Sequence, residues 1–181
     1  MIEIWIDELT ECLVERRTGL KRETEFGQVV ITEEIQRRLK KQGWLFEWDK
    51  AIGITEALRI KGDSEIQGLI SYSIKEGYVE VNLVESNPKN IGKNGCYVGV
   101  GGHLFAIACY RSALSNGDGV VAMTVKTSVI NHYREKLGAI SYGRKERMMI
   151  DGEASQTLME KYLKRWYTTD VQEGEYAREF I

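Results

Sequence analysis

The amino-acid sequence predicts an α+β fold, within the broad α/β class, in which helices flank a mixed and mostly antiparallel sheet. Three strand-like runs follow one another with short, turn-rich connectors, which is typical of an antiparallel meander. A buried helix then leads into an apolar strand, and two more short strands precede an amphipathic helix. The 181 residues suffice for one sizeable core, and no repeat or linker divides them, so we expect one domain.

The first part of the chain mixes strand and helix signals. Isoleucines at positions 2, 4 and 6 alternate with Glu3, Trp5 and Asp7, and this period of two predicts a strand with one buried face. A turn is expected at residues 17–19, and residues 28–31 are β-prone.

A helix is predicted from Thr32 to Gly43. Thr32 is a typical N-cap, Glu33 and Glu34 suit the positive end of the helix dipole, and Gly43 follows the last turn. Thr127 or Ser128 is expected to cap a later helix in the same way, and Gly138 to end it.

The remaining elements follow from hydrophobic periodicity and turn residues. The predicted strands are residues 56–60, 65–74, 78–85, 120–125, 139–142 and 146–150. The predicted helices are residues 103–115, 129–137 and 151–167, the last with a stripe of Leu158, Met159, Tyr162, Leu163 and Trp166, followed by a polar tail over 168–181.

Composition excludes several classes of protein. Hydrophobic residues make up 43% and charged residues 29%, as in ordinary globular proteins, and the net charge of -2 creates no field that would attract nucleic acid or an acidic membrane. The acidic N-terminus and the lack of a long apolar run predict a cytoplasmic protein without membrane or nucleic-acid partners. The three cysteines, Cys12, Cys96 and Cys109, match no disulfide or metal pattern, so we expect reduced thiols and no metal.

A glycine cluster precedes the predicted helix at His103. Gly99, Gly101 and Gly102 would let an anion approach the free N–H groups of a helix start, or would only permit a tight turn. Leu104 replaces the last glycine of a dinucleotide fingerprint, so a dinucleotide is not expected.

The strand before this cluster has an irregular pattern. Alternation holds through Leu83 and then slips by one residue, which predicts a β-bulge at Val84. Glu80, Asn82 and Glu85 would then project to one face, either as part of a ligand site or as solvated acids.

The order of meander, bulged strand, glycine loop, helix and strand resembles the GCN5-related N-acetyltransferase (GNAT) superfamily over about residues 55–150. The family loop, Q/R-x-x-G-x-G/A, maps onto residues 96–101, with Cys96 in place of Gln or Arg. Residues 132–139 are similar to the family segment FYEKLGF, with Arg134 where the tyrosine often stands and Tyr133 one place earlier.

The resemblance implies a split between two central strands that holds acetyl-CoA as cosubstrate. Residues 55–150 would form this acyl-CoA-binding core, and residues 1–54 the acceptor side. The implied cofactor-binding residues are Leu83, Val84, Glu85, Val98, Gly99, Val100, Gly101, Gly102, His103 and Arg134. The implied activity is direct acetyl transfer to a primary amine on a small molecule or peptide, and a homo-oligomer is compatible with the family. A non-catalytic acyl-CoA-binding or regulatory domain is the alternative.

For catalysis, Glu85 is preferred over Glu80 as general base, because it follows the bulge and lies nearer the expected thioester. Tyr133 is either the proton donor to the leaving thiolate or a core residue, and Arg134 either contacts phosphate or is solvated.

His103 is expected to cap the phosphate end or to face solvent. Lys126 is either a phosphate ligand or an ordinary surface lysine. The aromatic residues Trp44, Phe46 and Trp48 either line the acceptor pocket or belong to the core.

Overall fold

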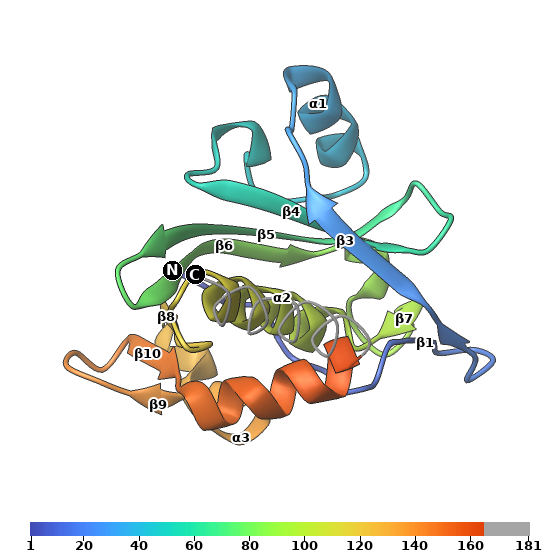
Figure 1. The fold of residues 1–181 in the computed structure, drawn as a ribbon. Helices are drawn as coiled ribbons and strands as arrows, with labels where there is room; N and C mark the ends of the chain where they lie inside the picture. The colour runs from blue at the N-terminus through green and yellow to red at the C-terminus, as the bar shows by residue number, and fades with distance from the viewer. Residues whose placement is uncertain (165–181) are drawn as a thin grey trace, which may run out of the picture.

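The computed structural model describes residues 1–164, and a seven-stranded sheet lies at its centre (Figure 1). Its strand order is β3-β4-β5-β6-β8-β10-β9, and every neighbouring pair is antiparallel except β6 and β8. The strands are β3 (Thr24–Gln28), β4 (Ile54–Ile60), β5 (Ile66–Lys75), β6 (Tyr78–Ser86), β8 (Val121–Thr124), β9 (Ile140–Ser141) and β10 (Arg147–Ile150). This confirms the predicted mixed, mostly antiparallel sheet.

A second, small sheet was not predicted. It joins β2 (Lys21–Arg22), β1 (Leu13–Glu15) and β7 (Tyr97–Val98) in that order. The predicted turn at residues 17–19 connects β1 and β2, with Gly19 at φ +70°. Strand β3 ends at Gln28, which is the first residue of the β-prone run 28–31 and the only one that the strand contains. The strand therefore lies earlier in the chain than the run predicted.

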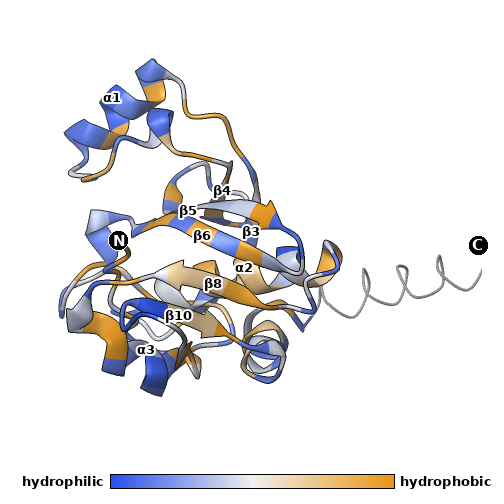
Figure 2. Cartoon of the chain, turned by 90° about the vertical axis from the view of Figure 1, so that its left-hand side faces the viewer, coloured by the Kyte–Doolittle hydropathy of each residue, from blue (hydrophilic) through white to orange (hydrophobic). Residues whose placement is uncertain are grey.

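Helix α1 (Glu33–Lys41) covers one face of the sheet (Figure 1). The Thr32 hydroxyl accepts a hydrogen bond from the Ile35 N–H at 3.3 Å, as the capping pattern predicted. The helix is mostly hydrophilic in Figure 2, and Leu39 on its inner side packs with Trp44 and Trp48 against the sheet.

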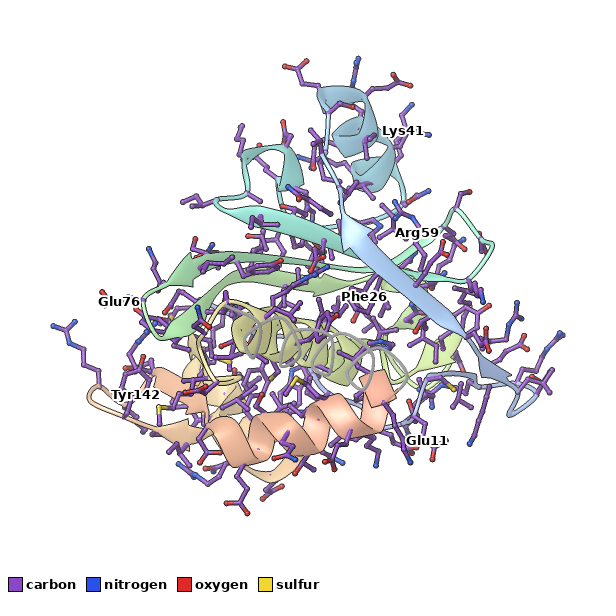
Figure 3. The ribbon with its side chains drawn as sticks, in the orientation of Figure 1. Glu11, Phe26, Lys41, Arg59, Glu76 and Tyr142 are labelled. Atoms are coloured by element: carbon purple, nitrogen blue, oxygen red, sulfur yellow. The ribbon has the colours of Figure 1, made fainter. Side chains whose placement is uncertain are left out.

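Helices α2 (Val100–Leu114) and α3 (Ile130–Leu137) lie on the opposite face, together with a helix over residues 152–164 (Figure 1). The described residues of α2 are almost all buried, whereas α3 is amphipathic and ends at Gly138, which has φ +65°. Side chains from the sheet, such as Phe26, point toward α2, while Lys41, Arg59 and Glu76 lie outside (Figure 3). The main core is therefore the layer between the sheet and α2.

Two helix starts differ from the prediction. Helix α2 begins at Val100 rather than His103, because Gly101 and Gly102 take part in its first turn. Thr127 belongs to a short 3-10 turn (Thr127–Val129), and no side chain caps α3.

The last helix confirms its predicted apolar stripe as far as the described residues extend. Leu158, Met159, Tyr162 and Leu163 are all buried against the core. The other predicted stripe residue, Trp166, and the polar tail 168–181 lie outside the described residues.

The parallel pair β6 and β8 is joined over only part of its length. Val79–Val81 pair with Val121–Met123, and β6 then continues to Ser86 without β8 as its partner. This is the predicted split between central strands. The register with β5 shifts at Asn82, so the bulge lies two residues before the predicted Val84.

The N-terminal segment, which we define as residues 1–10, lies beside this split. Ile2 forms a parallel bridge to Val125, just beyond β8, and it is the one bridge found in the segment. The predicted alternation is present, since Ile2 and Ile6 are buried and Trp5 is exposed, but a regular strand does not form.

Candidate functional site

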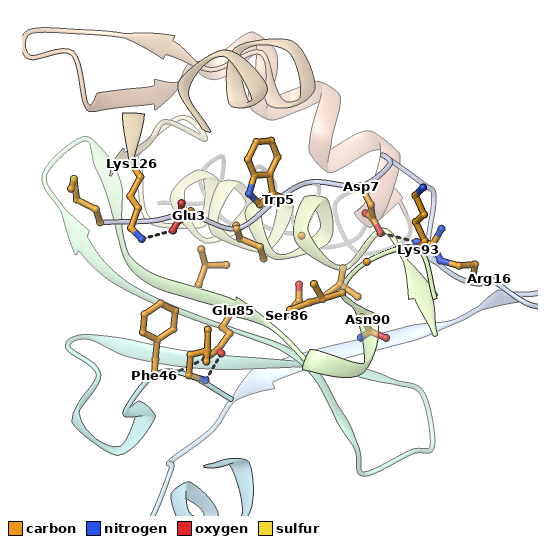
Figure 4. Close-up of a pocket in the computed structure, with 18 residues that line it drawn as sticks. Glu3, Trp5, Asp7, Arg16, Phe46, Glu85, Ser86, Asn90, Lys93 and Lys126 are labelled. Atoms are coloured by element: carbon orange, nitrogen blue, oxygen red, sulfur yellow. Dashed lines mark hydrogen bonds and ion pairs between the residues drawn. The ribbon is translucent and has the colours of Figure 1, made fainter. Parts of the chain in front are cut away.

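A pocket of about 560 Å³ separates β6 from the N-terminal segment (Figure 4). Its lining comes from six parts of the chain: the N-terminal segment, the turn after β1, the segment before β4, the end of β6 with its following loop, the start of α2, and the residues after β8. These residues are Met1, Glu3, Ile4, Trp5, Asp7, Arg16, Leu45, Phe46, Val84, Glu85, Ser86, Asn90, Ile91, Gly92, Lys93, Val100, Gly101 and Lys126.

The middle of the pocket is apolar, and its two ends are charged. Arg16 and Lys93 lie near Asp7 at the end beside α2, and Lys126 pairs with Glu3 at the other end (Figure 4). An elongated ligand with an anionic end and an apolar stem would match this distribution. Lys126, one of the residues considered as a phosphate ligand, lines the pocket and is paired with the Glu3 carboxylate.

Glu85, the preferred base, lines the pocket but is already hydrogen-bonded. Its carboxylate accepts from the N–H groups of Leu45 at 2.6 Å and Phe46 at 3.4 Å, and from the indole N–H of Trp48 at 2.8 Å. Only 7% of Glu85 is exposed. A carboxylate offers about four lone-pair sites, so three of them are used to hold the segment that carries Phe46.

Glu80, the second base candidate, does not line the pocket. Both of its oxygens accept from the Arg147 guanidinium, one of them at 2.8 Å from Nη2. Arg147 also contacts Thr124 and Tyr142, so this cluster joins β6, β8 and the end of the sheet. Glu80 and Glu85 therefore do not act on a common ligand in this arrangement.

Tyr133 and Arg134 also lie outside the pocket lining. Tyr133 is fully buried, packs edge-on against Phe105, and donates its hydroxyl hydrogen to the Ile4 carbonyl at 2.9 Å. Burial raises the pKa of this phenol above its usual value. Arg134 is exposed and donates to Asn131 at 2.8 Å.

The glycines at the start of α2 leave room for other parts of the chain. Gly99 has φ +97°, and a Cβ there would lie 2.1 Å from the Thr10 hydroxyl oxygen. A Cβ on Gly101 would lie 2.9 Å from the Ile6 side chain, and one on Gly102 would lie 2.5 Å from the Tyr162 hydroxyl. The bare first turn of α2 thus accommodates the N-terminal segment and the last helix.

The expectation for His103 was wrong. Its side chain is fully buried between Phe26 and Tyr162, so it neither faces solvent nor reaches an anion at the helix start. Burial lowers its pKa to about 3, and Nδ1 has no hydrogen-bond partner. The backbone N–H of His103 donates to the Gly99 carbonyl at 3.1 Å.

Of the sequence-predicted cofactor residues, the structure brings four to the pocket: Val84, Glu85, Val100 and Gly101. The other six do not line it: Leu83, Val98, Gly99, Gly102, His103 and Arg134. Leu83 packs toward the α1 side, and Val98 pairs with Val14 in the small sheet. Among the aromatic residues, Trp44 and Trp48 belong to the core and Phe46 lines the pocket.

Sequence reasoning missed the contribution of the N-terminal segment. Its alternation predicted a buried face, but nothing in the spacing indicated that Trp5 and Asp7 would line a pocket with β6. Among residues 1–164, no group of three or more His, Cys, Asp or Glu side chains is arranged to hold a metal ion. A helix both long enough and apolar enough to cross a bilayer does not occur in that part of the chain.

Comparison with known proteins identifies the fold. No protein-family model and no curated protein matches this sequence. The crystal structure of AtaTR bound with AcCoA superposes with a TM-score of 0.50 at 10% identity, covering 76% of this chain and 98% of that chain. The KacTA-DNA complex gives 0.47 at 11% identity, covering 76% and 98%. The catalytic domain of Tetrahymena GCN5 histone acetyltransferase in complex with coenzyme A gives 0.43 at 10% identity, covering 70% and 90%.

The first of these structures and the sheet itself identify the fold. A mostly antiparallel sheet whose one parallel pair separates beside a helix start is the arrangement that the family resemblance implied. The chain therefore has the fold of the GCN5-related N-acetyltransferases.

Proposed function

We propose that this protein transfers an acetyl group from acetyl-CoA to a primary amine on a small molecule or peptide. The observation that carries the proposal is the separation of β6 from β8 after Val81 and Met123, with a pocket along the unpaired part of β6. A strand edge without its neighbour offers backbone groups to an extended amide chain, which is the chemistry of the pantetheine arm.

The lining of the pocket supports an acyl-CoA in one orientation. The diphosphate would lie toward the start of α2, where the helix dipole favours an anion and where Arg16 and Lys93 supply positive charge. The arm would follow Val84 and Glu85 through the apolar middle of the pocket. We infer that the acceptor enters from the side of Leu45 and Phe46.

The reaction needs a place for one proton. The amine nitrogen attacks the thioester carbonyl carbon, the carbon–sulfur bond breaks, and the amine proton must leave while the thiolate gains one. We propose that Glu85 receives the amine proton through a water molecule, using the one lone-pair site that its three donors leave, and that this proton then passes through water to the departing thiolate, which leaves as the thiol.

A second function, acyl-CoA binding without turnover, is favoured by a specific observation. The side chains considered for proton transfer are all engaged: Glu85 by three donors, Glu80 by Arg147, and Tyr133 by Ile4. A regulatory domain would need the pocket but none of these groups in a free state.

Two measurements test the proposal and separate the alternatives. The protein is mixed with acetyl-CoA and panels of amines while free thiol is followed, and CoA affinity is measured by calorimetry. Thiol release that depends on an amine supports the transferase, whereas binding without release across broad panels favours the regulatory domain. No CoA binding would contradict both.

The location of the site is tested by Lys93→Glu, which reverses the charge of an exposed side chain in the pocket lining. We expect much weaker CoA binding with an unchanged circular dichroism spectrum. Lys75→Glu is the control, because Lys75 is exposed at the end of β5 and does not line the pocket. Unchanged CoA affinity in Lys93→Glu would remove the pocket from the proposal.

A further inference from the structure

An acidic side chain of the N-terminal segment already lies at the anion-favouring end of α2. The Asp7 carboxylate accepts from the Gly99 N–H, with Oδ1 at 3.1 Å and Oδ2 at 3.4 Å. Arg16 lies 3.9 Å from the same carboxylate. A helix N-terminus stabilises negative charge, so Asp7 satisfies the position that an incoming diphosphate would use.

Side chains of α3 and of the last helix bind the middle and the end of the segment that carries Asp7, and its first residues are bound to the chain after β8. Tyr133 donates to the Ile4 carbonyl, and His132 Nε2 accepts from the Ile6 N–H at 2.8 Å. The Trp5 ring lies 4.8 Å from the His132 ring, measured between centroids. These contacts come from side chains rather than from a strand ladder, so residues 4–8 can move away from α2 while the sheet and the bridge at Ile2 stay paired, at the cost of exposing the buried Ile6 side chain.

The glycines of α2 show how closely the segment fits. Ile6 occupies the space that a side chain on Gly101 would need, and Leu9 lies over Gly102. The chain itself therefore covers the helix turn whose bareness would otherwise admit a ligand.

We infer that Asp7 is an internal competitor of the cofactor's diphosphate, and that acyl-CoA binding displaces the N-terminal segment from α2. The inference rests on the proposed function. Displacement of Ile4 would also break the hydrogen bond that the Tyr133 hydroxyl donates to its carbonyl. Without a ligand, the N-terminal segment therefore bonds both to the start of α2 and to the Tyr133 hydroxyl.

The test compares Asp7→Asn with Glu8→Gln, two changes that each remove one negative charge from adjacent residues. Asn keeps an oxygen that can accept from Gly99 but removes the repulsion of a diphosphate. Glu8 is exposed and does not line the pocket, which makes Glu8→Gln the matched control. We expect Asp7→Asn to bind CoA about tenfold more tightly than the wild type, or about 1.4 kcal/mol, and Glu8→Gln to be unchanged.

Hydrogen exchange of the wild-type protein supplies a second, independent readout. Addition of CoA should accelerate exchange at Ile6 and its neighbours, since the bond to His132 would be broken. Unchanged affinity in Asp7→Asn, or unchanged exchange when CoA binds, overturns the inference and leaves the proposed function standing. If none of the three proteins binds CoA, the proposed function and this inference both fail.

Discussion

The two walls of the pocket are built in different ways. On one side, β6 pairs with β5 from Tyr78 to Ser86, and Glu85 adds three hydrogen bonds to the segment behind it. On the other side, the N-terminal segment has one bridge and separate bonds to α3, to α2, to the residues after β8 and to the last helix. The strand wall is therefore held by a continuous ladder, whereas the segment wall is held by separate contacts.

The largest effect is expected on the strand wall. Glu85→Ala leaves the N–H groups of Leu45, Phe46 and buried Trp48 without their acceptor, which should lower the free energy of unfolding by about 3 kcal/mol or more. Urea denaturation measures this change. Glu76→Ala, in the exposed turn before β6, should stay within about 0.5 kcal/mol of the wild type.

If Glu85→Ala unfolds at the same urea concentration as the wild type, the rigid-wall description is wrong. Glu85→Gln sharpens the result, because an amide retains only one acceptor oxygen. Its stability should fall less than that of the alanine variant. Any additional loss of thiol release in a folded Glu85→Gln protein would then report on the proposed proton transfer.

A smaller effect is expected where α3 holds the segment wall. Tyr133→Phe removes the hydrogen bond to the Ile4 carbonyl while keeping the ring against Phe105, so stability should fall by about 1 kcal/mol. Hydrogen exchange in residues 1–10 should accelerate, and exchange in β6 should not change. Tyr78→Phe, on β6, is the control. Equal acceleration of hydrogen exchange in residues 1–10 and in β6 would show that the two walls are not independent.

The smallest effect is a pH dependence of the segment wall. His132 accepts from the Ile6 N–H through Nε2, and burial lowers its pKa below 6.5. The unfolded chain therefore binds the proton more readily, so this contribution to stability is complete above pH 6.5 and is lost as pH falls toward the folded pKa. Between pH 7 and 5, hydrogen exchange in residues 1–10 should become faster.

Other titratable groups also affect the pH dependence around His132. Lys136 lowers its pKa and Glu135 raises it, and His103 adds a separate, global pH dependence in the same direction. His132→Gln removes only the local term, so its segment should exchange at a rate that changes little over this range. An identical pH response in wild type and variant would exclude His132 as the group responsible.

Local signals in the sequence predicted most of the fold correctly. Thr32 caps α1 through its own hydroxyl, and Gly138 ends α3 in the left-handed region, so each of these signals is contained within a few residues. The meander was equally readable, because its turns are short and its strands adjacent in sequence.

The features that were missed depend on contacts between distant residues. His103 is buried because Tyr162 packs on it from 59 positions later in the chain, and no nearby residue signals this. The glycines were interpreted as bare for a ligand, whereas Ile6 and Leu9 occupy the space they leave. The short strands β1 and β7 pair across more than 80 residues, which periodicity over a few residues does not reveal.

The small sheet sets a limit on how the N-terminal segment behaves once released. Val14 pairs with Val98, next to the start of α2, so the freed residues stay anchored close to the place they leave. A tether of about a dozen residues extends at most about 40 Å, and such tethers keep an effective concentration in the millimolar range. Re-closure of the segment is therefore unimolecular and does not weaken when the protein is diluted. At saturating CoA, the rate of complex formation should level off at the rate at which the segment opens.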